Sequence, residues 1–336
     1  MRKNFLIIII LISCIKIDAY ATDKIIATTS SPPEYLKNDL LNFKKKLEEK
    51  FIPKTEVVLL INGESGSEEN SLNGLRRGRS NITFVSVGAI AAIIPEISLL
   101  SLPFIFSSNQ EADFILDRYL LEYFKRKMPS KNLNIIRWVD SGWSIIYSKD
   151  KINNPYDLKK YRMRSSSSIA SRMFLELFKT DTVQLPFAEV IPALQTGLID
   201  GGTTSILMYH IAGIYEYAPY LTLTNHALNP GAVIVNNAWY QSLNSKNKLL
   251  IDKSFPTSKT LRQKHRTVEC ITEKEIMKFK IDITKNISSE WKNNIKKLHK
   301  NIIDKTSGNA EEVYNIILKG KKEFLLIKED IKNDCI

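Results

Sequence analysis

Hydrophobic and polar positions alternate along the first part of the chain in a pattern typical of strands separated by helices. Short apolar runs of strand length cover residues 25–28, 55–61 and 82–87. Between them, residues 36–51 and 67–77 have apolar side chains at helical spacing, and a glycine follows the second of these helices. Strands that alternate with helices pair in parallel through crossover helices, so we expect an α/β unit here.

The middle of the chain repeats this alternation, and the last part changes to a helical pattern. Further strands are expected at 135–139, 143–148, 158–164, 183–185 and 232–236, with helices at 168–178 and 189–196. From 246 to 299 the spacing is almost wholly helical, with breaks at Pro256 and Asn286. A second α/β unit and a helical tail therefore follow the first unit. No Gly- and Ser-rich linker separates the two units, which indicates several short crossings between two lobes.

The N-terminus has the pattern of an export signal. Two basic residues precede an apolar run, 5–13, that is too short to span a bilayer. Cleavage after Ala21 would start the mature chain at Thr22, and a lipoprotein box that ends at Cys14 is the alternative. We favour a signal peptide over 1–21 and expect a periplasmic protein.

Composition and charge limit the kinds of molecule that this chain is expected to bind. The chain is 43% hydrophobic and 25% charged, as globular proteins are, and its formal net charge is +12. Nucleic acid is not expected as a partner, because the lysines of 292–322 alternate with acidic residues and no aromatic stacking motif accompanies them. We expect a solvated basic face, whose positive field can also attract an anionic ligand.

No motif for catalysis or metal binding is present. The sequence has no His-Glu-x-x-His motif, no Gly-x-Ser-x-Gly elbow and no phosphate loop, so neither an enzyme nor a cofactor is expected. His210 and His226 are expected to be surface or core residues. Glu68 and Glu69 are adjacent and should point in different directions on a helix, unlike a catalytic carboxylate pair.

Two cysteines remain after the signal peptide, Cys270 and Cys335. They are too few for a disulfide scaffold and lack the histidine partners of a zinc site. One disulfide bond and two free thiols both remain open.

The carboxyl ends of the predicted strands point to a ligand site. Ser30, Gly63 and residues 86–88 follow the first three strands, where open α/β sheets bind ligands. Arg162 and Arg164 face one side of a later strand.

Arg164 has the most specific surroundings of these candidates. It ends its strand, and the serines 165–168 and a helix N-terminus follow it. A guanidinium fork, hydroxyl donors and backbone N–H groups together suit an anion. On this segment alone, a solvated basic edge remains the alternative.

Several longer segments resemble a known family. They are Gly66-Ser67-Glu68 with Leu72, Leu75 and Gly78, then Leu102 to Phe106, Asn154 to Lys159 with Arg162 to Arg164, Leu185 to Val190, Ala193 to Gly197, Asp200-Gly201, and Tyr220 to His226. Together they resemble the DctP-type substrate-binding component of TRAP transporters, the tripartite ATP-independent periplasmic systems. The resemblance runs from about residue 25 to 243, and its most specific part is 185–226.

The resemblance implies an α/β, two-lobed periplasmic-binding-protein fold with a central cleft and a long C-terminal helix that touches both lobes. Lobe I would comprise 22–140 and 230–269, and lobe II 141–229 and 270–336. The ligand would be a small organic carboxylate, a C4-dicarboxylate or a related 2-oxo or aromatic acid. The partners would be the membrane permease subunits of a TRAP transporter; an ATP-driven importer and an exported hydrolase or lyase are the alternatives.

The resemblance also implies ligand-binding residues. The family's carboxylate-binding arginine falls on Arg164, its pocket phenylalanine on Phe187 and a frequent pocket asparagine on Thr204. A second arginine and a glutamate of sialic-acid members fall near Ser144 and on Ser86, which argues against sialic acid. The expected ligand-binding residues are thus Arg164, Phe187, Thr204, Trp143, Ser144, Ser86, Gly88 and Ser165.

Overall fold

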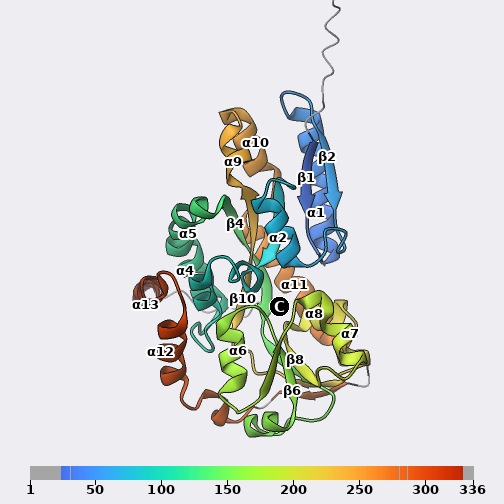
Figure 1. The fold of residues 1–336 in the computed structure, drawn as a ribbon, viewed down its shortest axis with the longest axis vertical. Helices are drawn as coiled ribbons and strands as arrows, with labels where there is room; N and C mark the ends of the chain where they lie inside the picture. Colours follow the sequence, from blue (N-terminus) through green and yellow to red (C-terminus); the bar gives the residue numbers. More distant parts are fainter. Residues whose placement is uncertain (1–23, 31, 280, 286, 328–336) are drawn as a thin grey trace, which may run out of the picture.

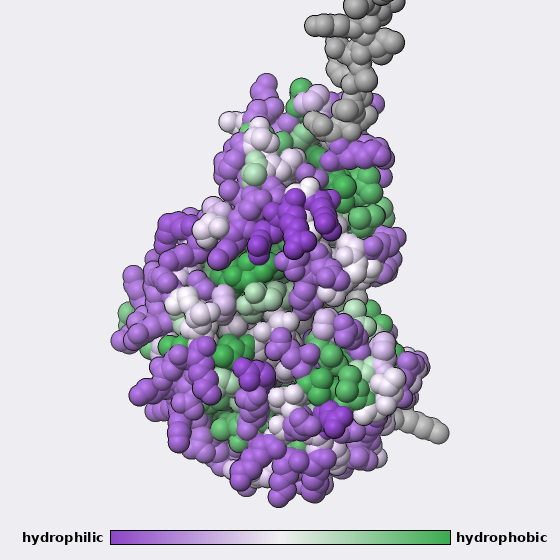
Figure 2. Space-filling view, in the orientation of Figure 1, coloured by the Kyte–Doolittle hydropathy of each residue, from purple (hydrophilic) through white to green (hydrophobic). Residues whose placement is uncertain are grey.

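The computed structural model describes residues 24–30, 32–279, 281–285 and 287–327, and in this part of the chain the strands form two sheets, one in each of two lobes. The lobes lie one above the other along the longest axis of the molecule (Figure 1). The two-lobed α/β architecture is as expected from the sequence. Hydrophilic side chains cover most of the face seen in Figure 2. No helix of the described residues is long and apolar enough to span a membrane.

The sheet of lobe I has the strand order β2-β1-β3-β10-β4. Its strands are β1 (Lys24–Thr28), β2 (Glu56–Leu60), β3 (Ile82–Ser86), β4 (Leu133–Trp143) and β10 (Leu228–Asn236). β1 pairs in parallel with both β2 and β3, which confirms the pairing predicted for the first unit. β10 pairs antiparallel with β3 and β4, so the middle of the chain completes the first sheet.

Helices cover this sheet because one face of each is apolar. In α1 (Glu34–Lys50), Leu36, Leu40, Phe43 and Leu47 recur at helical spacing and are all buried. The other helical segments up to β4 are α2 (Glu68–Arg76), α3 (Val87–Ile90), η1 (Pro95–Ser101), α4 (Asn109–Ile115), the π-helical η2 (Leu116–Leu120), α5 (Leu121–Lys127) and η3 (Met128–Lys131).

The sheet of lobe II has the order β11-β9-β5-β8-β6-β7. Its strands are β5 (Ile145–Ser148), β6 (Arg162–Ser165), β7 (Asp181–Gln184), β8 (Gly201–Thr204), β9 (Tyr220–Thr222) and β11 (Asp282–Thr284). β6 lies parallel between β7 and β8, and β5 lies antiparallel between β8 and β9.

Short helices connect the strands of lobe II, and a series of helices follows β10. Those of lobe II are η4 (Pro155–Lys160), α6 (Ile169–Glu176), η5 (Phe187–Glu189), α7 (Val190–Gln195), α8 (Ile206–Ile211) and η6 (Ile214–Glu216). Those after β10 are α9 (Asn237–Ser242), α10 (Ser245–Ser254), α11 (Ser258–Ile276), η7 (Ser289–Lys292), α12 (Ile295–Lys305) and α13 (Ala310–Ile327).

The two lobes are joined where β4 leads into β5. Gly142 has φ +80°, a conformation that L side chains rarely adopt, and a Cβ there would lie 2.9 Å from Cβ of Ser205. At the next crossing, the Ser144 N–H donates to the Ala227 carbonyl at 2.7 Å. The long helix α11 packs against β4 of lobe I and α8 of lobe II, so it touches both lobes as expected.

Two secondary-structure predictions were wrong. Residues 246–299 are not almost wholly helical, since β11 pairs with β9 and extends the second sheet; Asn286 lies outside the described residues. The strand expected at 158–164 begins only at Arg162, because the Asn154 side chain caps a 3₁₀ segment before it.

The last two helices lie along the side of the molecule. α12 packs against α6 of lobe II, and α13 packs against η1, α4 and η2, which precede β4 in the chain (Figure 1). The lobe boundaries given above remain a prediction.

Candidate functional site

A cavity of about 160 Å³ lies between the two lobes. The carboxyl ends of β1, β3 and β6 approach it, as expected for an α/β sheet, and residues of α2 and α11 complete the wall. Its lining is rich in hydroxyl groups: Thr29, Ser30, Ser86, Ser141, Ser144, Ser166, Ser171, Thr203, Thr204 and Ser205. The cavity thus offers a small ligand many possible hydrogen-bond partners among apolar side chains such as Phe84, Phe187 and Leu261.

Arg164 provides positive charge in this cavity. Its Nε donates to the Leu185 carbonyl at 2.9 Å, and Nη1 donates to the Thr203 carbonyl at 3.4 Å. The guanidinium carbon lies 5.8 Å from the centre of the Phe187 ring. These contacts hold the guanidinium in one orientation and leave Nη2 without a hydrogen bond to any described residue.

The charge of Arg164 is enclosed by protein. The residue is 6% exposed, and burial lowers the pKa of the guanidinium. In the described part of the chain its hydrogen bonds go to carbonyl oxygens and not to a carboxylate. The charges of Glu68 and Glu69 partly offset this lowering of the pKa, but neither carboxylate is hydrogen-bonded to the guanidinium, so Arg164 can still bind the carboxylate of a ligand.

Two acidic side chains from α2 line the same cavity. Burial raises the pKa of Glu68, although its carboxylate accepts hydrogen bonds from the Ser86 hydroxyl at 2.6 Å and the Ser86 N–H at 3.1 Å. Glu69 Oε1 accepts a hydrogen bond from the Ser167 hydroxyl of lobe II at 3.0 Å. Glu69 Oε2 is buried and has no partner among the described residues. The two glutamates were not expected to share a site, but both face this cavity.

The helix α11 contributes a histidine. His265 is 1% exposed, and its Nδ1 lies 3.0 Å from the Tyr35 hydroxyl. Burial lowers the pKa of His265, and the nearby Asp140 opposes part of this shift. Its Nε2 is buried and has no hydrogen-bond partner among the described residues. Nε2 can therefore exchange a hydrogen bond with a ligand hydroxyl.

Most of the residues predicted from the sequence meet in this cavity. Its lining includes Ser86, Gly88, Ser144, Arg164, Phe187 and Thr204. Trp143 lines a separate cavity, where its Nε1 donates to Asn109 Oδ1 at 2.7 Å. Ser165 is fully buried and does not line either cavity. Gly63 also lies away from the lining.

Sequence reasoning missed several lining residues. Glu69, His265 and Tyr35 face the cavity, and Asn229 donates to the Ser144 hydroxyl at 2.6 Å. The helical spacing of the residues in α11 could have indicated a long helix near the site. Only the fold shows which face of this helix meets the cavity.

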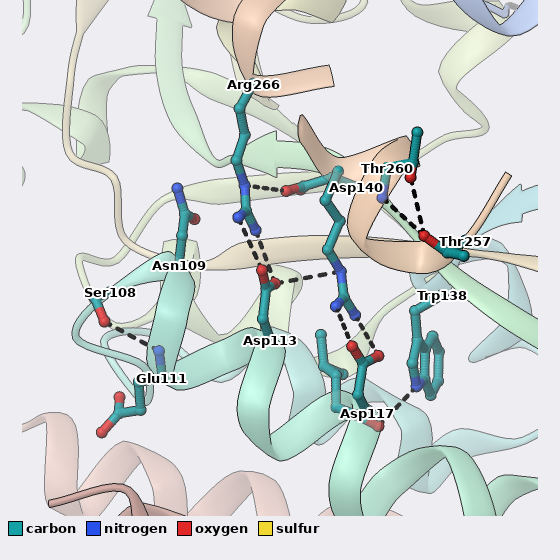
Figure 3. Close-up of polar contacts among 12 residues, drawn as sticks. Ser108, Asn109, Glu111, Asp113, Asp117, Trp138, Asp140, Thr257, Thr260 and Arg266 are labelled. Carbon is teal, nitrogen blue, oxygen red and sulfur yellow. Dashed lines mark hydrogen bonds and ion pairs between the residues drawn. The ribbon is translucent and has the colours of Figure 1, made fainter. Parts of the chain in front are cut away.

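A network of ion pairs holds α11 in place behind the cavity (Figure 3). Arg266 donates to Asp140 at 3.0 Å and to both oxygens of Asp113 at 2.8 Å. Arg262, 2% exposed, pairs with Asp113 and Asp117. Burial alone would raise the pKa of Asp140, but His265 and Arg266 bring it below the ordinary value. The network fixes the turn of α11 that carries His265.

The remaining sequence expectations concern thiols and metals. Cys270 is disulfide-bonded, and Cys335 lies outside the described residues. No group of three or more potential metal ligands occurs among the residues that the structure describes.

Residues 26–306 match the family of bacterial extracellular solute-binding proteins, family 7, also called DctP. The chain belongs to this family. This assignment agrees with the resemblance drawn from the motifs, and the family is one of binding proteins.

Individual relatives are similar in sequence. A solute-binding protein of Chromohalobacter salexigens is 28% identical over 66% of this chain and 66% of its own length. The 2,3-diketo-L-gulonate-binding periplasmic protein YiaO of Escherichia coli is 28% identical over 61% of each chain. The matches therefore span less than two thirds of the length of these curated relatives.

A solved structure covers more of the fold. The TRAP periplasmic solute-binding protein of Anaerococcus prevotii with bound D-glucuronate superposes with a TM-score of 0.82 at 20% identity. It covers 90% of this chain and 99% of the other. The two-lobed fold of this chain is thus that of TRAP solute-binding proteins.

Proposed function

We propose that this protein captures a sugar acid, a small carboxylate with several hydroxyl groups, and delivers it to the permease subunits of a TRAP transporter. The observation that carries the proposal is the pairing of one buried guanidinium, Arg164, with an opposite wall of acidic and hydroxyl side chains. The carboxylate would accept hydrogen bonds from Arg164. The sugar hydroxyls would donate to Glu69 and exchange hydrogen bonds with His265 and the lining serines.

The charges of the cavity favour a sugar acid over the C4-dicarboxylate expected at first. A dicarboxylate needs a second cationic partner, but Arg164 is the one arginine or lysine in the described lining, and the resemblance puts Ser144 near the second arginine of sialic-acid members. Its second carboxylate would share the cavity with Glu68 and Glu69, and like charges repel at an enclosed site. A chain of hydroxyl groups avoids this repulsion. The names of the relatives, which include diketogulonate and glucuronate binders, support the same class.

Export belongs to the same proposal. The predicted signal peptide over 1–21 and the alternative acylation at Cys14 lie outside the described residues. The family consists of extracellular solute-binding proteins, which supports a periplasmic site of action. Intact-mass analysis of the exported protein should give a chain that begins at Thr22; a lipid-modified Cys14 would replace this cleavage, and recovery of the full-length chain in the cytoplasm would reject export.

A thermal-shift panel followed by calorimetry tests the ligand class. D-Glucuronate, D-gluconate and 2,3-diketo-L-gulonate should raise Tm, because a ligand that binds only the native state stabilises it. Succinate and malate should have less effect, and sialic acid none. A larger shift with succinate than with every sugar acid would reject the proposed class and restore the dicarboxylate.

A further inference from the structure

The end of lobe I that is remote from the cavity carries a basic groove. It lies between α1 and α10 and is lined by Lys46, Lys50, Lys246, Leu249, Leu250, Lys253 and Ser254. The two ends of β1 and α1 show this distance. Thr29 follows β1 and Tyr35 lies in the first turn of α1, and both line the cavity. Lys24 and Lys50 lie at the opposite ends of these two elements. Figure 1 shows α10 and the start of β1 together at this end of the molecule.

Two large apolar side chains are exposed beside these lysines. Ile52 is 66% exposed and Leu249 is 52% exposed. Ile52 lies two residues after the end of α1. Its backbone N–H donates to Asn247 Oδ1 of α10 at 3.3 Å, and its carbonyl accepts from Asn247 Nδ2 at 2.7 Å. Asn247 is buried, so this apolar residue is held outward on an anchored loop.

The lysines of the groove are not neutralised by neighbours. Within the described residues, Lys46, Lys50, Lys246 and Lys253 form no ion pair, whereas nearby Lys44 pairs with Glu48. Lys246 and Lys253 are two helical turns apart and lie on one face of α10 with Leu249. The positive charge of this groove is therefore available to a partner.

Exposed apolar residues surrounded by unpaired lysines fit the surface of a membrane that contains anionic lipid. The apolar side chains enter the boundary between headgroups and acyl chains, and the lysines contact the headgroups. A soluble anion would use the lysines but would gain nothing from the exposure of Ile52. If Cys14 carried the lipid of the alternative processing, the anchor would join lobe I at this same end, ahead of Lys24.

We propose that this surface, defined by Lys46, Lys50, Ile52, Lys246, Leu249 and Lys253 and here called the basic tip, docks on the anionic surface of the cytoplasmic membrane. The docking concentrates the protein at the membrane that holds the permease. It also leaves the cavity between the lobes free, because the basic tip is at the opposite end of lobe I. The proposal goes beyond the capture of a sugar acid and shares with it only the premise of export.

Vesicle sedimentation with residues 22–336 tests the proposal. The parent should bind vesicles of phosphatidylglycerol and phosphatidylcholine, bind pure phosphatidylcholine vesicles much less, and lose binding as salt is added. The variant Lys46→Glu, Lys50→Glu, Lys246→Glu, Lys253→Glu should lose at least about tenfold in vesicle affinity. Ile52→Ser with Leu249→Ser, which keeps the charge, should also weaken binding.

The matched control changes the same net charge elsewhere. Lys296→Glu, Lys297→Glu, Lys300→Glu, Lys305→Glu on α12 should leave vesicle affinity within about twofold of the parent. Equal losses of vesicle affinity in the two quadruple variants would show that only the net charge matters, and would reject the basic tip as the docking surface. Failure of the parent to bind phosphatidylglycerol vesicles would reject it as well.

Folding and ligand binding are measured on every variant. Circular dichroism confirms the fold, and the Tm shift with the sugar acid reports the cavity. A basic-tip variant that loses the vesicles and keeps the Tm shift supports the proposal. Failure of all sugar acids to shift Tm, with vesicle binding intact, would instead reject the proposed ligand.

Discussion

At the residue scale, the orientation of Arg164 explains why it suits a carboxylate. Two carbonyl oxygens and the Phe187 ring fix the guanidinium, so little side-chain entropy remains to be lost when a ligand binds. The groups that fix it are neutral and engage only Nε and Nη1, so Nη2 remains available to a carboxylate.

Arg164→Ala should weaken binding of the sugar acid by roughly 30-fold or more, because loss of a buried charge partner costs about 2 to 5 kcal/mol. Arg164→Lys should also weaken it, since an ammonium keeps the charge without the fork. Calorimetry measures the affinity. The control is Arg162→Ala, whose side chain is exposed and pairs with Asp181 outside the cavity. Unchanged affinity in Arg164→Ala would refute the assigned carboxylate position.

The burial of His226 predicts how the stability of the protein depends on pH. It is 2% exposed and stacks on Phe174 with ring centres 4.2 Å apart, and burial lowers its pKa from 6.5 to about 3. Between these two values the unfolded chain binds a proton that the folded protein does not. Stability from this residue is therefore complete above about pH 6.5 and falls as the pH drops toward 3, by up to about 1.4 kcal/mol per pH unit.

Urea unfolding of the parent and of His226→Gln at pH 7 and pH 5 measures this dependence. The variant should be less stable at pH 7, because it loses the stacking, and its stability should fall less on going to pH 5. An equal fall in both proteins would contradict the assignment to His226.

Arg164 could be predicted from sequence because its strand end, its serines and the family motif coincide in one short segment. Glu69 and His265 could not, because their role depends on the distance between α2, α11 and β6, which are far apart in the chain. Trp143 was placed near the ligand by its neighbour Ser144. Trp143 ends β4 and Ser144 lies between β4 and β5, and the two residues line different cavities.

At the scale of elements, α11 depends on ion pairs for its position. Arg262 and Arg266 are buried against three aspartates from α4, η2 and β4. Removal of one member of such a network leaves a charge that water cannot reach.

Arg266→Met should lower the free energy of unfolding by about 3 to 5 kcal/mol, since Asp140 would stay buried without its partner. Lys151→Met is the control, because its pair with Asp282 is about half exposed and contributes less than about 1 kcal/mol. Denaturant unfolding measures both. Similar losses in the two variants would show that the buried network does not stabilise α11.

Long periodic elements were predictable and short ones were not. α1 has four apolar positions at helical spacing, and its bounds agree within two residues with the prediction. β11 has only three residues and lies in a region rich in lysine, so its pairing with β9 overrides a local pattern that indicates helix.

At the scale of the whole molecule, the two lobes touch directly beside the cavity. The Ser167 hydroxyl of lobe II donates to Glu69 of lobe I at 3.0 Å, and Gly88 packs close to Ser166. A Cβ on Gly88 would lie 3.4 Å from Ser166, so a small residue lets the lobes approach. The resemblance to the family predicts two lobes and a central cleft, but not the residues at which the lobes touch.

Ser167→Ala should weaken ligand binding through this contact and leave the ligand's own contacts intact. A hydrogen bond to a charged group contributes about 1.5 to 3 kcal/mol, which corresponds to roughly 10- to 150-fold in affinity; partial exposure of Ser167 places the expectation near the lower value. The contact exists only when the lobes are together, so its loss raises the free energy of the closed, ligand-binding arrangement. Small-angle scattering should then show a larger radius of gyration for Ser167→Ala than for the parent at equal, subsaturating ligand, and the difference should vanish at saturation.

The control is Ser242→Ala, which removes an exposed hydroxyl whose partner is the Trp239 carbonyl of its own helix. This variant should match the parent in both measurements. If Ser167→Ala binds the ligand as tightly as the parent does, the hydrogen bond from Ser167 to Glu69 does not stabilise the closed arrangement. Glu69 then serves only to bind the ligand, and the ligand itself bridges the lobes.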